Sequence, residues 1–174
     1  REGVLDIAPV TFIGGHIVEL LVSQGHKVKV FDNFSAGSMA NLASVEDRIE
    51  IIRGDIRDPE ALDRSMPDVH YVVHQAAEVS TIKSVEDPVF ANAVNVEGTL
   101  NVLVAAKDNG VKRMVMASSC AIYGDTGRRA QREDFPPHPL SPYGATKIAG
   151  EYYCDVFQQI YDIETVRLRY FNVF

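Results

Sequence analysis

The chain has 174 residues, 46% of them hydrophobic, and a formal net charge of −7. This length suits one globular domain that buries roughly 70% of its unfolded surface. The acidic balance, without a long basic run, argues against nucleic acid and anionic membranes as partners. We expect no membrane span and no signal peptide, because no apolar run approaches the ~20 residues of a spanning helix. Two cysteines, Cys120 and Cys154, are expected to be free thiols in a reducing, cytoplasmic compartment.

The first predicted element is a buried strand that ends near Ile7. It contains Asp6, and a charged group is costly to bury. A helical stripe follows after a short turn and closes at Gly25, a suitable C-cap; it consists of Ile13, Ile17, Leu20 and Leu21.

The turn between this strand and helix lacks most of its expected glycines. A turn that holds a dinucleotide pyrophosphate at a helix N-terminus normally contains them, because backbone must approach the phosphates closely. Here Ala8 and Thr11 stand where glycines are expected, Val10 and Thr11 add side chains, and only Gly14 remains. Pro9 also removes one N–H donor. This departure counts against cofactor binding.

The next two predicted strands each end in a carboxylate. Residues 27–31 form a strand that precedes Asp32-Asn33, 18 positions after Gly14. A carboxylate there can accept both ribose hydroxyls of an adenosine and repel a 2′-phosphate, which favours NAD over NADP. Residues 50–53 precede Asp55-Ile56, where an acceptor and an apolar side chain can bracket an adenine. Simple turn chemistry is the alternative at both places, with a helix starting near Pro59.

The strand predicted at residues 69–74 ends in His74-Gln75, followed by Ala76 and Ala77, which let the backbone pass close to a flat cofactor. On this strand His70 and His74 stand roughly 13 Å apart at ~3.3 Å per residue, so we predict no metal site. A long helix from Phe90 to near Gly110 follows, and then a strand at 113–117 that ends in Ser118-Ser119.

The last predicted helix carries Tyr143 and Lys147, four residues apart and therefore on one helix face. None of the other six of the seven tyrosines has a lysine at this spacing. An ammonium beside a phenol favours the phenolate and lowers its pKa from about 10, so that Tyr143 can move a proton from an alcohol. The alternative is an ordinary amphipathic helix, which continues through Ile148, Tyr152, Val156 and Ile160 before a strand at 165–169.

The alternation of strands and helices predicts an α/β fold with a doubly wound parallel sheet, in which ligands bind at the carboxyl ends of the strands. Together with this alternation, the motifs resemble the NAD-dependent epimerase/dehydratase group of the extended short-chain dehydrogenase/reductases. The matching stretches, in order, are 12–14, 32–33, 54–58, 74–77, 95–99, 118–124, 141–147 and 169–172.

This resemblance implies one NAD-binding, Rossmann-like α/β/α domain over residues 1–174, with the C-terminal substrate lobe of the family absent. It implies a sugar-nucleotide 4-epimerase of the UDP-glucose/UDP-galactose type, or the cofactor-binding half of one, with Ser119, Tyr143 and Lys147 as the catalytic set. Substrate is expected at Ser119, Tyr143, Phe171 and Asn172. NAD is expected at Phe12, Ile13, Gly14, Asp32, Asn33, Asp55, Ile56, Ala76, Ala77, Asn95, Tyr143, Lys147 and Tyr170.

Three alternatives stay open. The dehydratase branch carries an acidic pair after the active-site hydroxyl, whereas this chain has Cys120 and Ala121 there, which favours an epimerase. Epimerases for uronic acids or N-acetylated sugars are the second alternative. A non-catalytic Rossmann module is the third, because of the altered turn and the missing lobe. The resemblance also implies a homodimer through the helix that carries Tyr143 and Lys147.

Overall fold

The computed structural model describes residues 2–8 and 10–173, and within them the chain folds around a six-stranded parallel sheet in the order β3-β2-β1-β4-β5-β6. This order reverses between β1 and β4, where a doubly wound sheet opens its ligand crevice. The predicted fold class is confirmed. The strands are β1 (Gly3–Ile7), β2 (Lys27–Asp32), β3 (Ile49–Arg53), β4 (Val69–His74), β5 (Arg113–Ser119) and β6 (Glu164–Tyr170).

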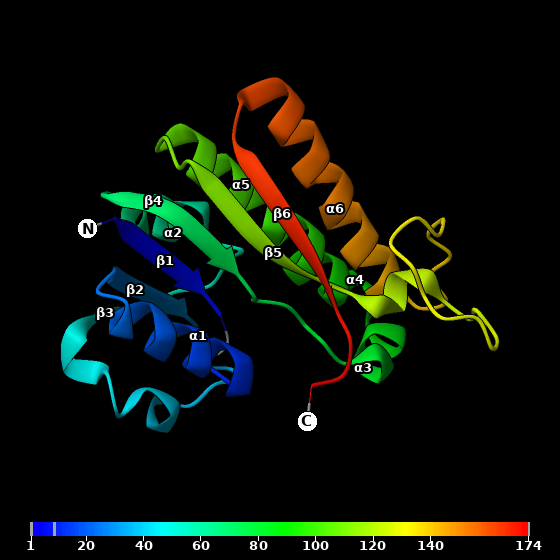
Figure 1. Cartoon of the computed structure of the whole chain (residues 1–174), viewed down its shortest axis with the longest axis horizontal. Coiled ribbons are helices and arrows are strands. Elements are labelled where there is room, and N and C mark those ends of the chain that lie inside the picture. The colour runs from blue at the N-terminus through cyan, green and yellow to red at the C-terminus, as the bar shows by residue number, and fades with distance from the viewer. Residues whose placement is uncertain (1, 9, 174) are drawn as a thin grey trace.

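The helices lie in two layers, one on each face of the sheet (Figure 1). The α-helices are α1 (Phe12–Ser23), α2 (Pro59–Ser65), α3 (Thr81–Glu86), α4 (Pro88–Asn92), α5 (Gly98–Asp108) and α6 (Pro142–Tyr161). Three short 3-10 segments, η1 (Met39–Leu42), η2 (Glu46–Arg48) and η4 (Cys120–Tyr123), and one π-helical turn, η3 (Ala93–Glu97), complete them.

Two apolar clusters hold these layers together. On one face, α1 and η1 pack on β2 through valines and one leucine: Val10, Val18, Val22, Val28, Val30, Leu42 and Val45. On the opposite face, α2, α5 and α6 cover the centre of the sheet (Figure 1). The larger cluster there includes Leu5, Ile7, Phe31, Leu62, Val72, Leu103, Met114 and Phe157. Phe31 and Ile56 of the larger cluster reach the carboxyl edge of the sheet, where they line a cavity.

The run from α4 through η3 to α5 corrects one prediction. These 21 residues, Pro88–Asp108, are long and apolar enough to span a membrane by length and composition, with a mean hydropathy of 1.3 in the most apolar window. The sequence-based expectation did not foresee that this run would meet the length and composition of a span. In this fold 44% of that window is buried, and Val102, Leu103 and Ala106 belong to the core. Its apolar character is used for packing against the sheet.

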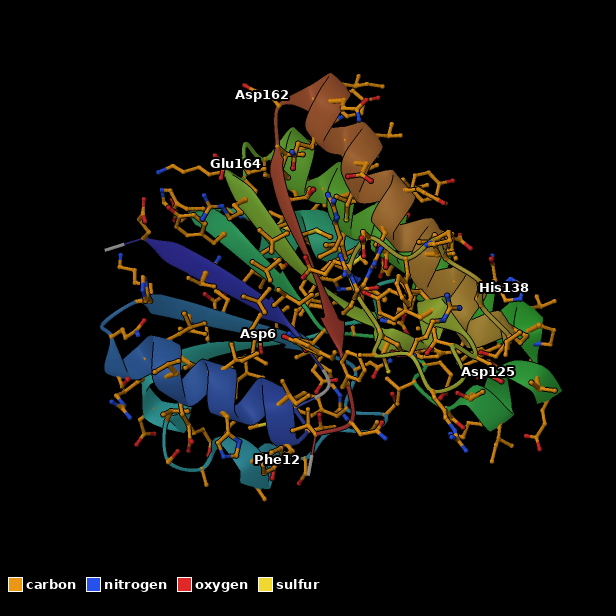
Figure 2. The ribbon with its side chains drawn as sticks, turned by 45° about the vertical axis from the view of Figure 1, so that its right-hand side comes forward. Asp6, Phe12, Asp125, His138, Asp162 and Glu164 are labelled. Carbon is orange, nitrogen blue, oxygen red and sulfur yellow. The ribbon has the colours of Figure 1, made fainter. Side chains whose placement is uncertain are left out.

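Asp6 lies in β1, as the sequence predicted (Figure 2), and its side chain is fully buried. Its sheet neighbours are Val30 and Val73. Neither carboxyl oxygen finds a hydrogen-bond partner among the residues that the structure describes. Burial, and secondarily the charge of Asp32, raise the pKa of Asp6 well above its ordinary value. The fold therefore favours the neutral carboxyl at this position.

Candidate active site

The N-terminus of α6 is fixed at the carboxyl edge of the sheet by two serines. Ser141 caps the helix by accepting the amide of Gly144 at 3.1 Å. The hydroxyl of Ser84, which is buried in α3, accepts the amide of Tyr143 at 3.1 Å. Pro142 occupies the first turn, where its missing N–H costs nothing. These contacts fix the first turn of α6 and therefore the direction in which the side chain of Tyr143 projects from the helix.

The structure brings Tyr143, Lys147 and Ser119 together. The ammonium nitrogen of Lys147 lies 5.8 Å from the centroid of the Tyr143 ring. The hydroxyl of Ser119, the last residue of β5, lies near enough to the phenol to lower its pKa. Phenol, amine and hydroxyl therefore converge beside the ends of the central strands, which is the geometry that proton transfer from an alcohol requires.

The pKa of Tyr143 corrects the sequence-based prediction. Burial raises the pKa of the phenol, and the hydroxyl of Ser119 lowers it by less than burial raises it. The predicted lowering by Lys147 is therefore wrong for the chain by itself. Helical spacing brings the two side chains close, but desolvation of the phenol outweighs that proximity.

Lys147 is buried, and its ammonium donates to the carbonyl oxygen of Ala117 at 3.0 Å. Burial lowers the pKa of Lys147 to about 8. Most of these side chains are still protonated at pH 7, so a positive charge remains beside Tyr143. Burial and this charge in turn lower the pKa of His74 to about 3. The histidine is thus neutral and bonds to Thr99 at 2.9 Å.

A cavity of about 590 Å³ opens at the carboxyl edge of β1, β2, β3 and β4. Six of the residues predicted to bind cofactor line it: Asp32, Asn33, Asp55, Ile56, Ala76 and Ala77. Phe31, Gly54, Arg57, Lys83 and Phe90 also line it. Its size is within the range of small-molecule and cofactor sites.

The two carboxylates of this cavity are already oriented by the chain. Asp32 is buried and accepts the amides of Val10 at 2.7 Å and Phe34 at 2.8 Å. Asp55 accepts hydrogen bonds from the guanidinium of Arg57 at 2.9 and 2.7 Å and from the side-chain amide of Asn33 at 3.1 Å. The hydrogen bonds from Arg57 hold the pKa of Asp55 far below its usual range. Asp55 is therefore an ionised acceptor at neutral pH.

Asn95 has a structural task in this chain. It lies in the π-helical turn η3 and is buried, with its side-chain oxygen accepting the amide of Glu78 at 2.8 Å. Its nitrogen donates to the carbonyl of Glu78 and to the hydroxyl of Thr146, each at 3.0 Å. Asn95 thus joins the loop after β4 to α6, and it is not among the residues that line the cavity.

The remaining predicted residues lie at the start of α1 and at the end of β6. Phe12, Ile13 and Gly14 begin α1, and the ring of Phe12 is exposed at the edge of the molecule (Figure 2). Tyr170, opposite Ser119 in the sheet, accepts a hydrogen bond from Gln75 at 3.3 Å. Phe171 and Asn172 follow β6 and are exposed.

Sequence reasoning missed Ser84, Thr146, Arg57 and the buried Glu151 of α6. Of these, Glu151 alone carried a signal, because it lies one helical turn after Lys147 and shares its face.

A sequence model of the NAD dependent epimerase/dehydratase family matches residues 11–174. A putative UDP-glucose 4-epimerase of Methanocaldococcus jannaschii is 38% identical over 94% of this chain and 53% of the relative. Among solved structures, a Thermus thermophilus UDP-glucose 4-epimerase in complex with NAD has a TM-score of 0.90 at 41% identity, covering 97% of this chain and 54% of that protein. A UDP-N-acetylglucosamine 4-epimerase of Methanobrevibacter ruminantium in complex with UDP-N-acetylmuramic acid reaches 0.94 at 36% identity, covering 100% and 56%.

The chain belongs to the NAD-dependent epimerase/dehydratase family. It spans about half the length of the relatives it matches. These relatives are named as epimerases, and NAD is the cofactor of the family.

The described residues fit this cofactor of the epimerase/dehydratase family at two places. The cavity offers the carboxyl groups of Asp32 and Asp55 beside apolar and small residues, which suits an adenosine. The first turn of α1 offers backbone amides that have no partner within the helix, which suits a pyrophosphate. The turn before α1 departs from the usual pattern, because the side chain of Val10 is buried in the core and its amide is bonded to Asp32. Pro9 lies outside the described residues.

Proposed function

We propose that this chain is the NAD-binding half of a sugar-nucleotide 4-epimerase of the UDP-glucose/UDP-galactose type. The observation that carries the proposal is the proximity of Ser119, Tyr143 and Lys147. They lie at the same carboxyl edge of the sheet as the cavity, although the residues that line the cavity do not include them. Curated and solved relatives at 36–41% identity that are named as UDP-sugar 4-epimerases support it. The free thiols of Cys120 and Cys154 fit a reducing compartment, and we place the protein in the cytoplasm.

The residues act on the 4-hydroxyl of the sugar. Ser119 donates a hydrogen bond to the reacting oxygen, and the ionised oxygen of Tyr143 accepts the hydroxyl proton. Lys147 holds a positive charge 5.8 Å from the centroid of the phenol ring, while burial keeps the pKa of the phenol raised. When bound, NAD would supply the acceptor, and then the donor, of the hydride at C4. When the hydride returns to the other face of the 4-keto sugar, Tyr143 gives the proton back and the configuration at C4 is inverted.

The cofactor residues follow from the same proposal. Asp32 and Asn33 hold the adenosine ribose, and Asp55 and Ile56 bracket the adenine. The amides of Phe12, Ile13 and Gly14 hold the pyrophosphate, and the small side chains of Ala76 and Ala77 allow close approach of the backbone. Tyr170 and Lys147 lie toward the nicotinamide end, and Phe171 and Asn172 toward the sugar nucleotide.

Cys120 and Ala121 favour an epimerase over a dehydratase. They directly follow Ser119 in η4, where a dehydratase of this family needs an acidic pair for chemistry at C5 and C6. An alanine cannot supply an acid, and a thiol is a weaker acid than a carboxylic acid. An epimerase for N-acetylated sugars or uronic acids would use the same residues, so an activity assay has to identify the sugar.

The second candidate function is a non-catalytic Rossmann module that binds a ligand without turnover. The buried Val10 side chain and the contact of its amide with Asp32 favour it, because both restrict the turn that should receive the pyrophosphate. Binding of NAD without conversion of any nucleotide sugar is the result that this candidate predicts.

The test is conversion of UDP-galactose to UDP-glucose by the purified chain with added NAD. Turnover that falls by at least about 100-fold in Tyr143→Phe is expected, because the phenol carries the proton transfer. Tyr152→Phe is the matched control, since Tyr152 lies on the exposed face of the same helix. No turnover by the wild-type chain, or equal turnover by Tyr143→Phe, would contradict the proposal.

We also propose a homodimer through α6. Its outer face exposes apolar side chains spaced four residues apart, Tyr152, Val156 and Ile160. Helices with such a stripe pair to remove it from water.

A further inference from the structure

A buried ion pair lies behind the Ser119, Tyr143 and Lys147 site. Glu151, one turn after Lys147 on α6, accepts two hydrogen bonds from the guanidinium of Arg169 on β6. Arg169 Nε lies 3.0 Å from Oε1, and the second nitrogen lies 2.8 Å from Oε2. The glutamate is only 6% exposed. This fork has a fixed geometry, because both groups are planar and each bond restricts the other.

The ion pair also contacts the strand end that carries Ser119. The hydroxyl of Ser118 donates to Oε1 of Glu151 at 2.5 Å. Ser118 is also the partner of Arg169 in the β5–β6 pairing. Both the ion pair and the sheet therefore hold Ser118 in place. Ser119 follows directly, and its hydroxyl accepts the amide of Ala121 at the start of η4. The orientation of Ser119 therefore depends on a residue that Glu151 holds.

Arg169 uses another nitrogen to hold the segment after the site. This nitrogen donates to the hydroxyl of Tyr123 in η4 at 3.0 Å and to the carbonyl of Glu133 at 3.1 Å. Glu133 belongs to the loop between Asp125 and His138, which lies beside the start of α6 (Figure 2). One guanidinium thus joins β6, α6, η4 and this loop around the end of β5.

We propose that Glu151 and Arg169 are positioning residues, which fix the hydroxyl of Ser119 relative to the phenol of Tyr143; this inference rests on the proposed function. A buried ion pair is poor at raising stability, because desolvation of both charges cancels most of their attraction. Its value here is geometric, since it fixes three segments at one point. A displacement of about 1 Å at a reacting group can cost about 100-fold in rate.

The decisive variant replaces both charges at once, as Glu151→Leu with Arg169→Met. Apolar side chains of similar volume leave no unpaired buried charge, so this double variant is expected to fold. It removes the hydrogen bonds to Ser118, Tyr123 and Glu133. Arg169→Lys is the second variant, because an ammonium keeps the charge and cannot form the fork. Arg113→Met is the matched control, since Arg113 pairs with Glu164 on the same two strands at their opposite end (Figure 2).

The first measurement separates kcat from KM for UDP-galactose. We expect kcat of the double variant to fall about 10- to 100-fold with KM changed by less than about threefold. The kcat of Arg169→Lys should also fall, and Arg113→Met should keep the wild-type kcat and KM. A folded double variant with wild-type kcat would overturn the positioning role.

The second measurement needs no activity. Cys120 follows Ser119 and is partly exposed, whereas Cys154 is buried, so Cys120 reports on the end of β5 through its rate of reaction with a thiol reagent under native conditions. The rate should rise several-fold in the double variant and stay unchanged in Arg113→Met. If the wild-type chain lacks turnover, the proposed function fails by itself, and an unchanged rate at Cys120 then rejects the positioning role separately.

Discussion

The amide of Val10 donates a hydrogen bond of 2.7 Å to the carboxylate of Asp32. This contact joins the turn before α1 to the end of β2, the two places where a dinucleotide fold holds its pyrophosphate and its adenosine ribose. The second oxygen of Asp32 accepts the amide of Phe34 at 2.8 Å. The carboxylate is therefore held in place before any ligand arrives, and each oxygen keeps a further lone pair for a ribose hydroxyl.

The side chain of Thr11 is predicted to weaken NAD binding. Thr11 is the N-cap of α1 and makes no capping hydrogen bond, so its hydroxyl does not stabilise the helix. Its backbone is extended, with φ of −99°, and a glycine can adopt this conformation. Thr11→Gly should therefore raise the affinity for NAD several-fold with little loss of stability. Calorimetric titration checks this, and an affinity equal to or below that of the wild type would contradict it.

Much of the fold could be predicted because its strands carry simple signals. The predicted strand at 69–74 has the bounds of β4, and the strand at 113–117 differs from β5 only by two residues at its end. In contrast, α3 was missed, because its six residues are too short to show a helical stripe. The π-helical turn between α4 and α5 also has no signature in apolar spacing.

The candidate site could be predicted only in part. The proximity of Tyr143, Lys147 and Ser119 could be predicted, because helical spacing is a local property and the position of a strand end follows from the topology of the sheet. The pKa of Tyr143 depends on how deeply the fold buries it, which spacing does not contain. Asn95 shows the same limit, since its contacts with Glu78 and Thr146 come from segments far away in sequence.

Lys147 makes the stability of the chain depend on pH. Its pKa of about 8 in the folded state lies below its ordinary value of 10.5, so the unfolded chain binds the proton more tightly. Its contribution therefore destabilises the fold below pH 8 and disappears as the pH rises to about 10.5. The free energy of unfolding of the wild type minus that of Lys147→Met should rise over this window by at most about 3 kcal/mol. A difference that is flat or falling in urea titrations would contradict this.

Asp6 is predicted to destabilise the fold at neutral pH. Its raised pKa means that the folded chain retains a proton that the unfolded chain loses, so this contribution to stability falls as the pH rises above about 4. Asp6→Val continues the row of Val30 and Val73 and should raise the free energy of unfolding at pH 7 by about 1–3 kcal/mol. Glu50→Val on the exposed side of β3 is the control. Denaturant unfolding that finds Asp6→Val less stable would reject this account.

The outer face of α6 is predicted to hold two copies together. Replacing Tyr152 with Glu and Ile160 with Lys places charges on a stripe whose side chains are 59% and 66% exposed in one copy. Light scattering should find a dimer for the wild type and a monomer for this double variant. Leu20→Lys, on α1, is the control and should remain dimeric. A wild-type monomer at high concentration would exclude this interface.

The most direct measurement of the central claim is a calorimetric titration of NAD into the wild-type chain and Asp32→Ala. The arrangement of Asp32, Asp55 and the first turn of α1 predicts saturable binding with micromolar affinity. Asp32→Ala should weaken it at least about tenfold, because a carboxylate that accepts ribose hydroxyls is lost. Asp47→Ala, a substitution in the exposed η2 segment, should leave it unchanged. Absence of saturable heat, or equal affinity in Asp32→Ala, would contradict a chain that holds NAD across the carboxyl edge of its sheet.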